Sequence, residues 1–379
     1  MKIMFAVHTY YPDKNGVQMV TEYMAEGLAK RHEVLVVTEK KGYADTESYR
    51  NVSIERIYVS KRGFRFIGEK DIFIEKIKDY APDVLICVCT QSWTFDWLWG
   101  QIDKLPCKKV LYTHGYSALL KKYPLFKDLL HGRLHAFYYH FYWMYYYKRA
   151  WRLMKKFQLV THLSVNNISV WYQGKHNLRN GMILENAVED IFFELGGEKR
   201  NDTICYIYIA NYDDNKNQKL VLEAFADANI KNTKLILAGS GEITYYQQLR
   251  KLLEKIKESN SALRVEILYG VSREQVYEIY NQAHVFICGS KKEQYPIMLC
   301  EAAAAGLAVI STRVGHAETM PGIKLVETRK EMADAISLFG CKKEERIESG
   351  EKMRLYAKEH FQKKDKIDEF EKALLQLLE

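Results

Sequence analysis

Residues 290–311 read SKKEQYPIMLCEAAAAGLAVIS, and this stretch says more about the fold than any other part of the chain. Two glutamates, Glu293 and Glu301, lie on either side of Pro296, a residue that fits the first turn of a helix. The alanine-rich run that follows predicts a helix, and residues 308–311 predict a buried strand. A loop, a helix and a strand therefore succeed one another, as they do in the repeating unit of a parallel α/β sheet.

The same alternation extends through the whole chain. Apolar, β-branched runs predict strands, and the segments between them are helical in pattern. The predicted strands of the first half are 2–8, 33–38, 52–59, 83–89, 109–113 and 158–164, and those of the second half are 203–210, 234–238, 264–268, 284–288 and 308–311. This rhythm predicts an α/β protein with two doubly wound parallel-sheet domains.

Composition locates the domain boundary. A chain of 379 residues with 47% hydrophobic content is too long for one comfortable core. Between the two runs of strands, residues 196–202 are polar and contain two glycines, as suits a linker. We expect a first domain over 1–188, a second over 189–355, and a C-terminal helix over 356–379 that packs back on the first domain.

The cysteines and the N-terminus indicate a cytosolic protein. The seven cysteines are odd in number, scattered, and mostly embedded in apolar runs, so we expect reduced, buried thiols. No stretch approaches the roughly 20 apolar residues that a membrane-spanning helix needs. Since Met1 leads directly into a predicted strand, we expect neither a signal peptide nor a membrane span.

Ligands of doubly wound sheets bind beyond the carboxyl ends of the strands, so we expect the ligand-binding residues in the strand-to-helix loops. The free amides around Ile297 and Met298 form the positive end of a helix, which suits a diphosphate or sugar hydroxyls. Glu293 would accept hydrogen bonds from sugar hydroxyls, and Glu301 from a ribose diol. The alternative interpretation is an ordinary amphipathic helix with a surface glutamate near each end.

Two glutamates separated by seven residues, followed by a small-residue helix and a Gly-Leu-x-Val-Ile strand, resemble the signature of the retaining glycosyltransferases of family 4, or glycosyl transferases group 1. The resemblance implies the GT-B fold, in which two Rossmann-like domains face a cleft. It also implies transfer of a sugar, with retention of configuration, from a nucleotide-diphosphate sugar.

Other loops resemble the same family in the same order. Residues 210–218 occupy the place where the family carries an arginine and a lysine on the diphosphate; Lys216 fits, and Asn211 replaces the arginine. Losing a guanidinium shifts more of the leaving-group stabilisation onto Lys216 and the helix amides. Taken alone, Lys216 would be interpreted as a solvated surface lysine.

The remaining donor contacts are assigned by the same resemblance. They follow predicted strands or begin the helix of the opening stretch, and for the loops at 239 and 269 a plain strand-to-helix turn is the alternative. The expected donor-binding residues are Gly16, Asn211, Gly239, Ser240, Gly241, Tyr269, Val271, Tyr295, Pro296, Ile297, Met298 and Glu301.

The first domain carries two of the expected positions. Residues 11–17 resemble the family's glycine loop, in which only Gly16 of the usual pair remains. The loop lacks the G-x-G-x-x-G of a dinucleotide fold, which argues against an oxidoreductase. His114 follows a predicted strand where the family has a histidine near the donor sugar, although a packed or surface histidine is the alternative.

Positive charge is concentrated in one segment. Residues 104–156 hold twelve Lys and Arg against one acid, Asp128, so this segment carries more than the net charge of +8. Within it, residues 135–152 are aromatic on every side of a helix. Tyr and Trp favour the bilayer interface, and each Lys or Arg near anionic headgroups contributes about 1 kcal/mol.

We therefore expect residues 119–156 to attach the protein to an anionic membrane surface, the inner leaflet of the cell membrane, near a lipid-linked glycan acceptor. A buried helix or an aromatic sugar-binding wall is the alternative. No RNA-binding motif accompanies the segment, so nucleic acid is not an expected partner. His131 and His135 share a helix face without a third ligand, and we expect no metal.

The resemblance implies a metal-independent hexosyltransferase of polysaccharide biosynthesis that uses a UDP-sugar by preference and no cofactor. Glu293 would orient the donor sugar, Lys216 would stabilise the leaving diphosphate, and His114 would contact the sugar. Two other functions stay open. One is a glycosyltransferase of a soluble acceptor; the other, suggested by Asn211 and Gly16, is a non-catalytic nucleotide-sugar-binding subunit.

Overall fold

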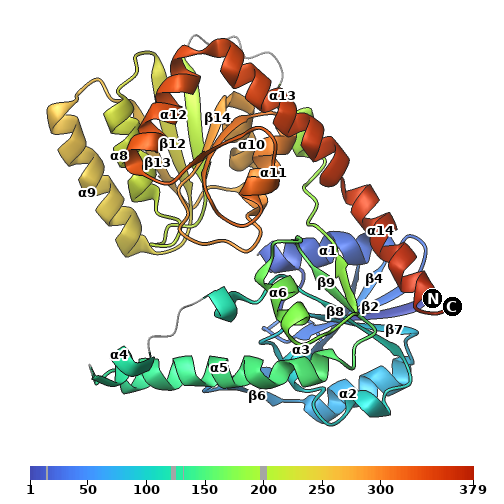
Figure 1. The fold of residues 1–379 in the computed structure, drawn as a ribbon. Helices are drawn as coiled ribbons and strands as arrows, with labels where there is room; N and C mark the ends of the chain where they lie inside the picture. Colours follow the sequence, from blue (N-terminus) through green and yellow to red (C-terminus); the bar gives the residue numbers. More distant parts are fainter. Residues whose placement is uncertain (14–15, 121–124, 131, 197–202) are drawn as a thin grey trace. The chain divides into compact units, whose positions relative to one another are not determined.

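The computed structural model describes residues 1–13, 16–120, 125–130, 132–196 and 203–379 (Figure 1). The chain divides into two compact units. Unit 1 comprises residues 1–186 and 363–379, and unit 2 comprises residues 187–362. The chain thus enters unit 2 after Asn186 and returns to unit 1 at Lys363, rather than at residues 189 and 356.

Unit 1 is built on an eight-stranded sheet with the order β10-β9-β8-β7-β1-β2-β4-β3, in which only the β3–β4 pair is antiparallel. Its inner strands are continuously buried, because helices cover both faces of a parallel sheet. The strands are β1 Lys2–Ala6, β2 Glu33–Glu39, β3 Thr46–Tyr49, β4 Val52–Ile57, β7 Val84–Val88, β8 Lys108–Tyr112, β9 Leu159–His162 and β10 Gly181–Ile183. The parallel strands run outward in both directions from β1 and β7, so the order reverses between these two.

A separate hairpin of β5 (Val59–Arg62) and β6 (Arg65–Gly68) follows β4. The expectation of one strand over 52–59 is therefore wrong at its end. The chain leaves the sheet at Tyr58, and Gly63 turns the hairpin with a φ of +62° that favours glycine. Apolar residues on both sides of Tyr58 made the two strands look continuous.

The helices of unit 1 are α1 Gly16–Leu28, α2 Lys70–Tyr80, α3 Trp93–Asp96, α4 Leu125–Leu130, α5 Leu134–Met154, α6 Ile168–Lys175 and α14 Lys363–Gln376. Two 3-10 turns, η1 Ile102–Lys104 and η2 Ser117–Leu120, connect them. The C-terminal α14 packs on α1, where Phe370 is fully buried against Tyr112 with ring centroids 5.3 Å apart. Arg31 holds α14 through Asp368 (2.6 Å) and Glu371 (2.9 Å).

Unit 2 is a wholly parallel six-stranded sheet with the order β13-β12-β11-β14-β15-β16, and its order reverses between β11 and β14. The strands are β11 Ile204–Ile209, β12 Thr233–Gly239, β13 Val265–Tyr269, β14 Val285–Cys288, β15 Ala308–Thr312 and β16 Ile323–Val326. The helices are α7 Ile191–Glu194, α8 Gln218–Ala228, α9 Ile243–Ser259, α10 Arg273–Gln282, α11 Ile297–Ala304, α12 Arg329–Cys341 and α13 Lys343–His360, with a 3-10 turn η3 at Ala317–Thr319.

The prediction of two doubly wound parallel sheets is confirmed. The helix expected over 356–379 is two helices, because α13 stays packed on α11 and β15 of unit 2 and only α14 joins unit 1. Strands β3, β10 and β16 were missed, since each is short and half exposed and lacks an apolar run. In each unit, the reversal of strand order is where a ligand crevice is expected.

Candidate active site

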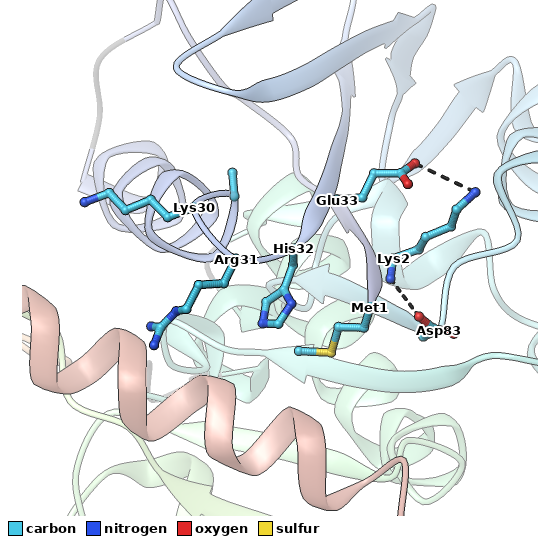
Figure 2. A pocket seen from close by; sticks show the side chains of 8 residues that line it. Met1, Lys2, Lys30, Arg31, His32, Glu33 and Asp83 are labelled. Atoms are coloured by element: carbon cyan, nitrogen blue, oxygen red, sulfur yellow. Dashed lines mark hydrogen bonds and ion pairs between the residues drawn. The ribbon is translucent and has the colours of Figure 1, made fainter.

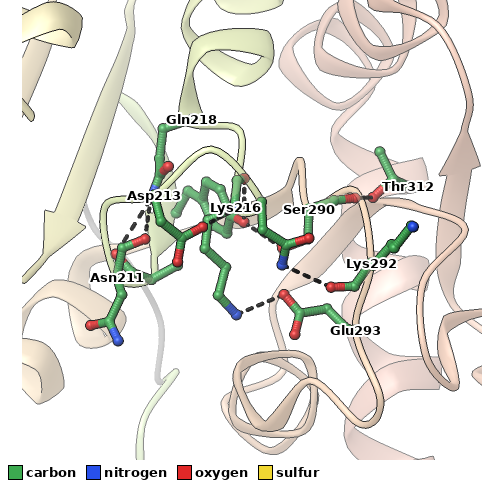
Figure 3. Close-up of polar contacts among 11 residues, drawn as sticks. Asn211, Asp213, Lys216, Gln218, Ser290, Lys292, Glu293 and Thr312 are labelled. Atoms are coloured by element: carbon green, nitrogen blue, oxygen red, sulfur yellow. Dashed lines mark hydrogen bonds and ion pairs between the residues drawn. The ribbon is translucent and has the colours of Figure 1, made fainter. Parts of the chain in front are cut away.

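Lys216 and Glu293 form an ion pair at the reversal of strand order in unit 2 (Figure 3). Lys216 lies in the loop after β11 and Glu293 in the loop after β14, and the two side chains are 19% and 14% exposed. The Lys216 Nζ lies 2.6 Å from Glu293 Oε1. The pair therefore places an ammonium group and a carboxylate together where doubly wound folds bind their ligands.

Hydrogen bonds between the two loops hold this pair in place. The Tyr208 hydroxyl donates to the Lys216 carbonyl (2.8 Å) and bonds with Ser290 Oγ (2.9 Å). Asn215 donates to the Lys292 carbonyl (2.9 Å), and the Lys291 amide donates back to the Asn215 carbonyl (2.7 Å). Because both loops are bonded to each other and to the core, the site is organised before any ligand arrives.

Helix α11 begins beside Glu293. Pro296 has ψ of 101° and caps the helix from outside, so its expected place in the first helical turn is wrong by one residue. Gly315 has a φ of +55°, and a Cβ at this position would lie 2.4 Å from Pro296 Cδ. Only glycine lets the loop after β15 approach Pro296 so closely. The backbone amides of Ile297 and Met298 lie in the first turn of α11 and therefore have no hydrogen-bond acceptor within the helix.

Tyr295 is buried and stacks on His316, with ring centroids 3.8 Å apart and planes inclined by 14°. Burial lowers the pKa of His316 to about 3, so this imidazole is neutral at physiological pH. Both side chains are buried next to the start of α11, and neither faces solvent.

Glu301 is engaged by groups that the sequence did not indicate. Its Oε1 accepts from Arg273 Nη2 (2.7 Å), and its Oε2 accepts from the Tyr280 hydroxyl (3.2 Å). Arg273 also bonds Glu189 (2.7 Å). Burial raises the pKa of Glu301, and Arg273 opposes that shift. Arg273 begins α10 directly after the predicted loop at Val271, so a cation beside a strand end is the signal that could have indicated it.

The glycine loop after β12 and the tyrosine after β13 lie together. A Cβ on Gly239 would come within 1.9 Å of the Ala210 carbonyl oxygen, and Gly241 has a φ of +116°. Tyr269 donates to the Gly241 carbonyl (2.8 Å) and stacks with Tyr212 at 6.1 Å and 14°. Ser240 and Val271 flank these contacts in the same loops.

Asn211, the expected substitute for an arginine, is exposed in the loop after β11. Its carbonyl oxygen accepts from Gln218 Nε2 (2.9 Å), which ties the loop to the start of α8. The side chain supplies no positive charge. Of the lysines in this loop pair, Lys216 is the one that pairs with Glu293, whereas Lys291 pairs with Asp214.

Two predicted residues lie in unit 1. Gly16 is the first residue of α1, and the preceding Lys14 and Asn15 are outside the described residues. His114 follows β8 and its ring lies 5.0 Å from that of Tyr112. Burial lowers the pKa of His114 to about 4, and its buried Nε2 has no hydrogen-bond partner within the described part of the chain. His114 is thus a neutral imidazole with unused bonding capacity.

The basic and aromatic segment forms α4 and α5, although residues 121–124 and His131 are outside the described residues. One face of α5 is buried through Trp143, Tyr147, Ala150, Leu153 and Met154. The opposite face of α5 is exposed and carries large hydrophobic side chains, and so does the neighbouring α4. These residues are Leu134, Tyr138, Phe141, Met144 and Tyr145 on α5, and Phe126, Leu129 and Leu130 on α4. A wholly buried helix is therefore excluded.

No described helix has the length and apolar character to cross a membrane. Nor do His, Cys, Asp and Glu side chains of the described ranges gather in threes as metal ligands. The seven cysteines are free thiols, of which Cys89 is partly exposed, Cys341 is exposed, and the others are buried.

An open pocket lies at the edge of the unit 1 sheet where the strands begin, opposite their carboxyl ends (Figure 2). It is lined by Met1, Lys2, Asp83 and residues 29–33, at the amino ends of β1 and β2. Ligands of doubly wound folds bind at the other edge, so we do not assign this pocket to the active site.

Two family models match the chain. The model described as Glycosyltransferase Family 4 matches residues 14–170, and the one described as Glycosyl transferases group 1 matches residues 191–320. The two matches fall on the strands and helices of units 1 and 2 respectively, and the second one contains Lys216, Glu293 and Glu301.

Named proteins resemble the chain at low identity. A protein of Arabidopsis thaliana, named as one subunit of phosphatidylinositol N-acetylglucosaminyltransferase, is 23% identical over 358 residues, which cover 89% of this chain and 73% of that protein. Among solved structures, HepE of Anabaena in complex with UDP aligns with a TM-score of 0.76 at 12% identity, over 99% of this chain and 100% of that one. Sucrose-phosphate synthase of Thermosynechococcus elongatus aligns with a TM-score of 0.73 at 15% identity, over 99% of this chain and 98% of that one.

Proposed function

Because the chain belongs to the GT-B glycosyltransferases of family 4 and group 1, we propose that it transfers a hexose or N-acetylhexosamine from a UDP-sugar to a lipid-linked acceptor, with retention of configuration. The Lys216–Glu293 pair at the reversal of strand order in unit 2 carries this proposal. The UDP complex of HepE supports the nucleotide, and the name of the Arabidopsis relative supports N-acetylglucosamine and a phosphatidylinositol acceptor.

The ion pair supplies the two functions that the donor needs. When the diphosphate binds, Lys216 exchanges the Glu293 carboxylate for phosphate oxygens and stabilises the charge that grows on the leaving group. Glu293 is then released to accept hydrogen bonds from sugar hydroxyls, which orients the anomeric carbon. The Ile297 and Met298 amides at the start of α11 add positive potential from the other side of Glu293.

Three further groups complete the donor site that we propose. The glycines at 239 and 241 let the backbone approach the phosphates, and Tyr269 with the backbone at Val271 faces the base. Glu301 binds the ribose diol with its carboxylate oriented by Arg273. For His114 of unit 1, a neutral imidazole, the contact with the donor sugar is proposed from the family resemblance alone.

We propose that the reaction needs neither a divalent cation nor a cofactor. Lys216 and the α11 N-terminus carry the positive charge that a metal would otherwise bring to the diphosphate. Since Asn211 adds none, the reaction depends more strongly on Lys216 than in relatives with an arginine. Full turnover in excess EDTA is the expected result.

Unit 1 is the part of the chain that we propose brings the protein to its acceptor. The exposed aromatic face of α4 and α5 is bordered by Arg149, Arg152 and Lys155, a combination suited to the anionic inner leaflet of a membrane. The protein would reach its lipid-linked acceptor, a precursor in polysaccharide or glycolipid assembly, by attaching to that surface.

The test is release of UDP by the full-length protein from UDP-N-acetylglucosamine, UDP-glucose and other nucleotide sugars, with vesicles containing phosphatidylinositol, in EDTA. We expect lipid-dependent release from one donor, with Glu293→Ala reducing kcat by a factor of about 100 or more. Glu348→Ala is the matched control, because Glu348 pairs with Lys352 at 2.6 Å on the exposed face of α13, far in sequence from the crevice loops. Equal loss in both variants would contradict the assignment of Glu293.

Two other functions predict different results. Release of UDP with a soluble acceptor and no lipid would favour a soluble-acceptor glycosyltransferase. Tight UDP binding without turnover of any donor would favour a non-catalytic subunit, an alternative to which Asn211 and the word "subunit" in the relative's name both lend support.

A further inference from the structure

Unit 1 has a further open pocket, of about 400 Å³, at the edge of its sheet where β9 and β10 begin. Its lining consists of Trp151 and Lys155 at the end of α5 and of residues 176–180, the turn that leads from α6 into β10. Ligands of doubly wound sheets bind beyond the carboxyl ends of the strands, at the opposite edge. The pocket is therefore separate from the reversal of strand order in either unit, and its volume is that of a small-molecule site.

The charged side chains of this pocket are all positive. Lys155 and Arg179 are both exposed, and neither forms an ion pair within the described part of the chain. The next residue, Lys156, differs from Lys155, because it pairs with Asp103. Residues 129–184 contain eight Lys and Arg and no acid, so the segments that build the pocket supply positive charge only. The pocket thus presents an ammonium and a guanidinium group to an anion.

Asn180 holds the turn between α6 and β10 against the end of α5. Its Nδ2 donates to the carbonyl oxygens of Met154 (3.1 Å) and Phe157 (2.7 Å), and its Oδ1 accepts from Gln173 Nε2 (3.3 Å). Carbonyl oxygens at the end of a helix carry its negative pole, which repels an anion. Since the Asn180 amide bonds one carbonyl at the end of α5 and one just beyond it, that repulsion is reduced, and the backbone of the preceding Arg179 is fixed.

Two stacked rings form the aromatic part of the lining. Trp151 and His176 lie with ring centroids 5.3 Å apart and planes inclined by 8°. The Trp151 indole is fixed further by its Nε1, which donates to the Lys148 carbonyl (3.1 Å). Burial and the neighbouring Lys175 lower the pKa of His176, so its imidazole is neutral at physiological pH. The rings therefore add a rigid aromatic surface, and the charge of the pocket comes from its two cations.

We propose that this pocket binds a phosphate monoester. The planar guanidinium of Arg179 suits two phosphate oxygens at once, and the ammonium of Lys155 suits a third. Trp151 and Leu178 lie against the carbon part of the ester. Such a group reaches a protein from two sources, a free phosphorylated molecule or the headgroup of a phospholipid. The site shares no residue with the donor site, so it does not depend on sugar transfer.

Calorimetry with sn-glycerol 3-phosphate and the full-length protein tests the pocket. We expect binding that Arg179→Ala and Lys155→Ala each weaken about tenfold or more, because each substitution removes a charge-assisted hydrogen bond to the phosphate. Lys175→Ala is the matched control. It removes the same charge beside the turn, but Lys175 lies over the Trp171 ring (5.0 Å) and outside the pocket lining. Unchanged affinity in Lys175→Ala would show that the two lining cations act by direct contact.

The proposal is overturned if the wild-type protein does not bind sn-glycerol 3-phosphate, or if Arg179→Ala and Lys155→Ala bind it as tightly as the wild type. An equal loss in Lys175→Ala would also overturn it, because the attraction would then come from the general charge of the segment. Inorganic phosphate should bind more weakly than the ester, since it lacks the carbon part that contacts Trp151. Equal affinity for the two would show a simple anion patch and contradict a site for esters.

Lys216→Ala separates this pocket from the donor site. We expect wild-type affinity for sn-glycerol 3-phosphate in this variant, because Lys216 belongs to unit 2 and the pocket to unit 1. Loss of binding in Lys216→Ala would mean that the ester occupies the donor site, and it would refute the pocket. Binding that depends on Arg179 in a protein that transfers no sugar would support the pocket and leave the proposed function without support.

Vesicles identify the source of the phosphate. Flotation with phosphatidic acid vesicles that exceeds flotation with phosphatidylglycerol vesicles of equal surface charge, and that loses this excess in Arg179→Ala, would assign a lipid headgroup. Binding of sn-glycerol 3-phosphate without such a preference would assign a free phosphorylated molecule. Either result supports the pocket, because phosphatidic acid and the soluble ester carry the same phosphate monoester.

Discussion

Lys216 and Glu293 stand 77 residues apart in the chain, yet they share one ion pair at 2.6 Å. Their side chains are largely buried, so removing one partner leaves the other as an uncompensated charge. In the proposed mechanism each partner also contacts a different part of the donor. The two residues should therefore behave as one unit in kinetics.

We expect Lys216→Ala to lower kcat/KM by a factor of about 100 to 1000, the range found when one preorganised charge-stabilising group is lost. The double variant Lys216→Ala/Glu293→Ala should be no worse than about the poorer single variant, because residues that act as a unit are not additive. Steady-state UDP release measures this. Multiplicative losses in the double variant would show that the two side chains act independently.

Lys352→Ala is the control for the lysine. Lys352 lies 2.6 Å from Glu348 in an exposed i, i+4 pair on α13, where such a pair contributes about 0.3–0.5 kcal/mol to stability. Its removal should leave kcat/KM unchanged. A matching loss of activity would indicate a general effect of lost charge.

Among the helices, α5 is the most informative. Its inner face fastens the loop after β7 and the β5–β6 hairpin, and its outer face exposes Tyr138, Phe141 and Tyr145. A helix that served packing alone would place its aromatic residues inward. The outer aromatic residues therefore need another explanation, and attachment to a membrane surface is the one that the adjacent basic residues favour.

We expect Phe141→Ser/Tyr145→Ser to reduce flotation with anionic vesicles at least about tenfold, since full burial of a large apolar side chain contributes about 1.5–3 kcal/mol. The helix should persist, because neither side chain packs in the core. Trp171→Ser is the control: Trp171 is an equally exposed aromatic residue on α6. Flotation of the double variant at wild-type levels, or none by the wild type, would contradict membrane attachment through α5.

Across the whole chain, the path leaves unit 1 at Asn186 and returns at Lys363, so the stability of unit 1 depends on the last helix. Phe370 of α14 is fully buried against Tyr112, and Arg31 pairs with two acids of the same helix. All six tryptophans lie in unit 1, so tryptophan fluorescence reports the unfolding of this unit alone.

We expect Phe370→Ala to lower the free energy of unfolding of unit 1 by about 3–5 kcal/mol, as is usual when a buried phenylalanine is truncated. UDP affinity, which we assign to unit 2, should be unchanged. Leu375→Ala, on an exposed part of α14, should change stability by less than about 0.5 kcal/mol. Denaturant titration followed by tryptophan fluorescence checks both, and a stable Phe370→Ala protein would show that α14 is dispensable to unit 1.

The two parallel sheets could be predicted from the sequence alone, because long apolar strands between amphipathic helices leave few other ways to bury their side chains. The sequence also placed Lys216 and Glu293 in loops directly after strands, as the structure does, and put the start of α11 within one residue. Signals of this kind depend only on residues that are neighbours in the sequence. They did not separate β5 from β4, or α14 from α13, where the breaks are only one residue (Tyr58) and two residues (Phe361 and Gln362) long.

Which loops meet depends on the folded chain. Neighbouring parallel strands place loops from distant parts of the chain at one edge, and no periodicity records the strand order. This is why the contact of Arg273 with Glu301 and the contact of His8 with Glu39 were not expected from the sequence. Each residue alone is ordinary; the close approach of an imidazole or guanidinium to a buried carboxylate exists only once β1 lies beside β2, or α10 beside α11, in the tertiary structure.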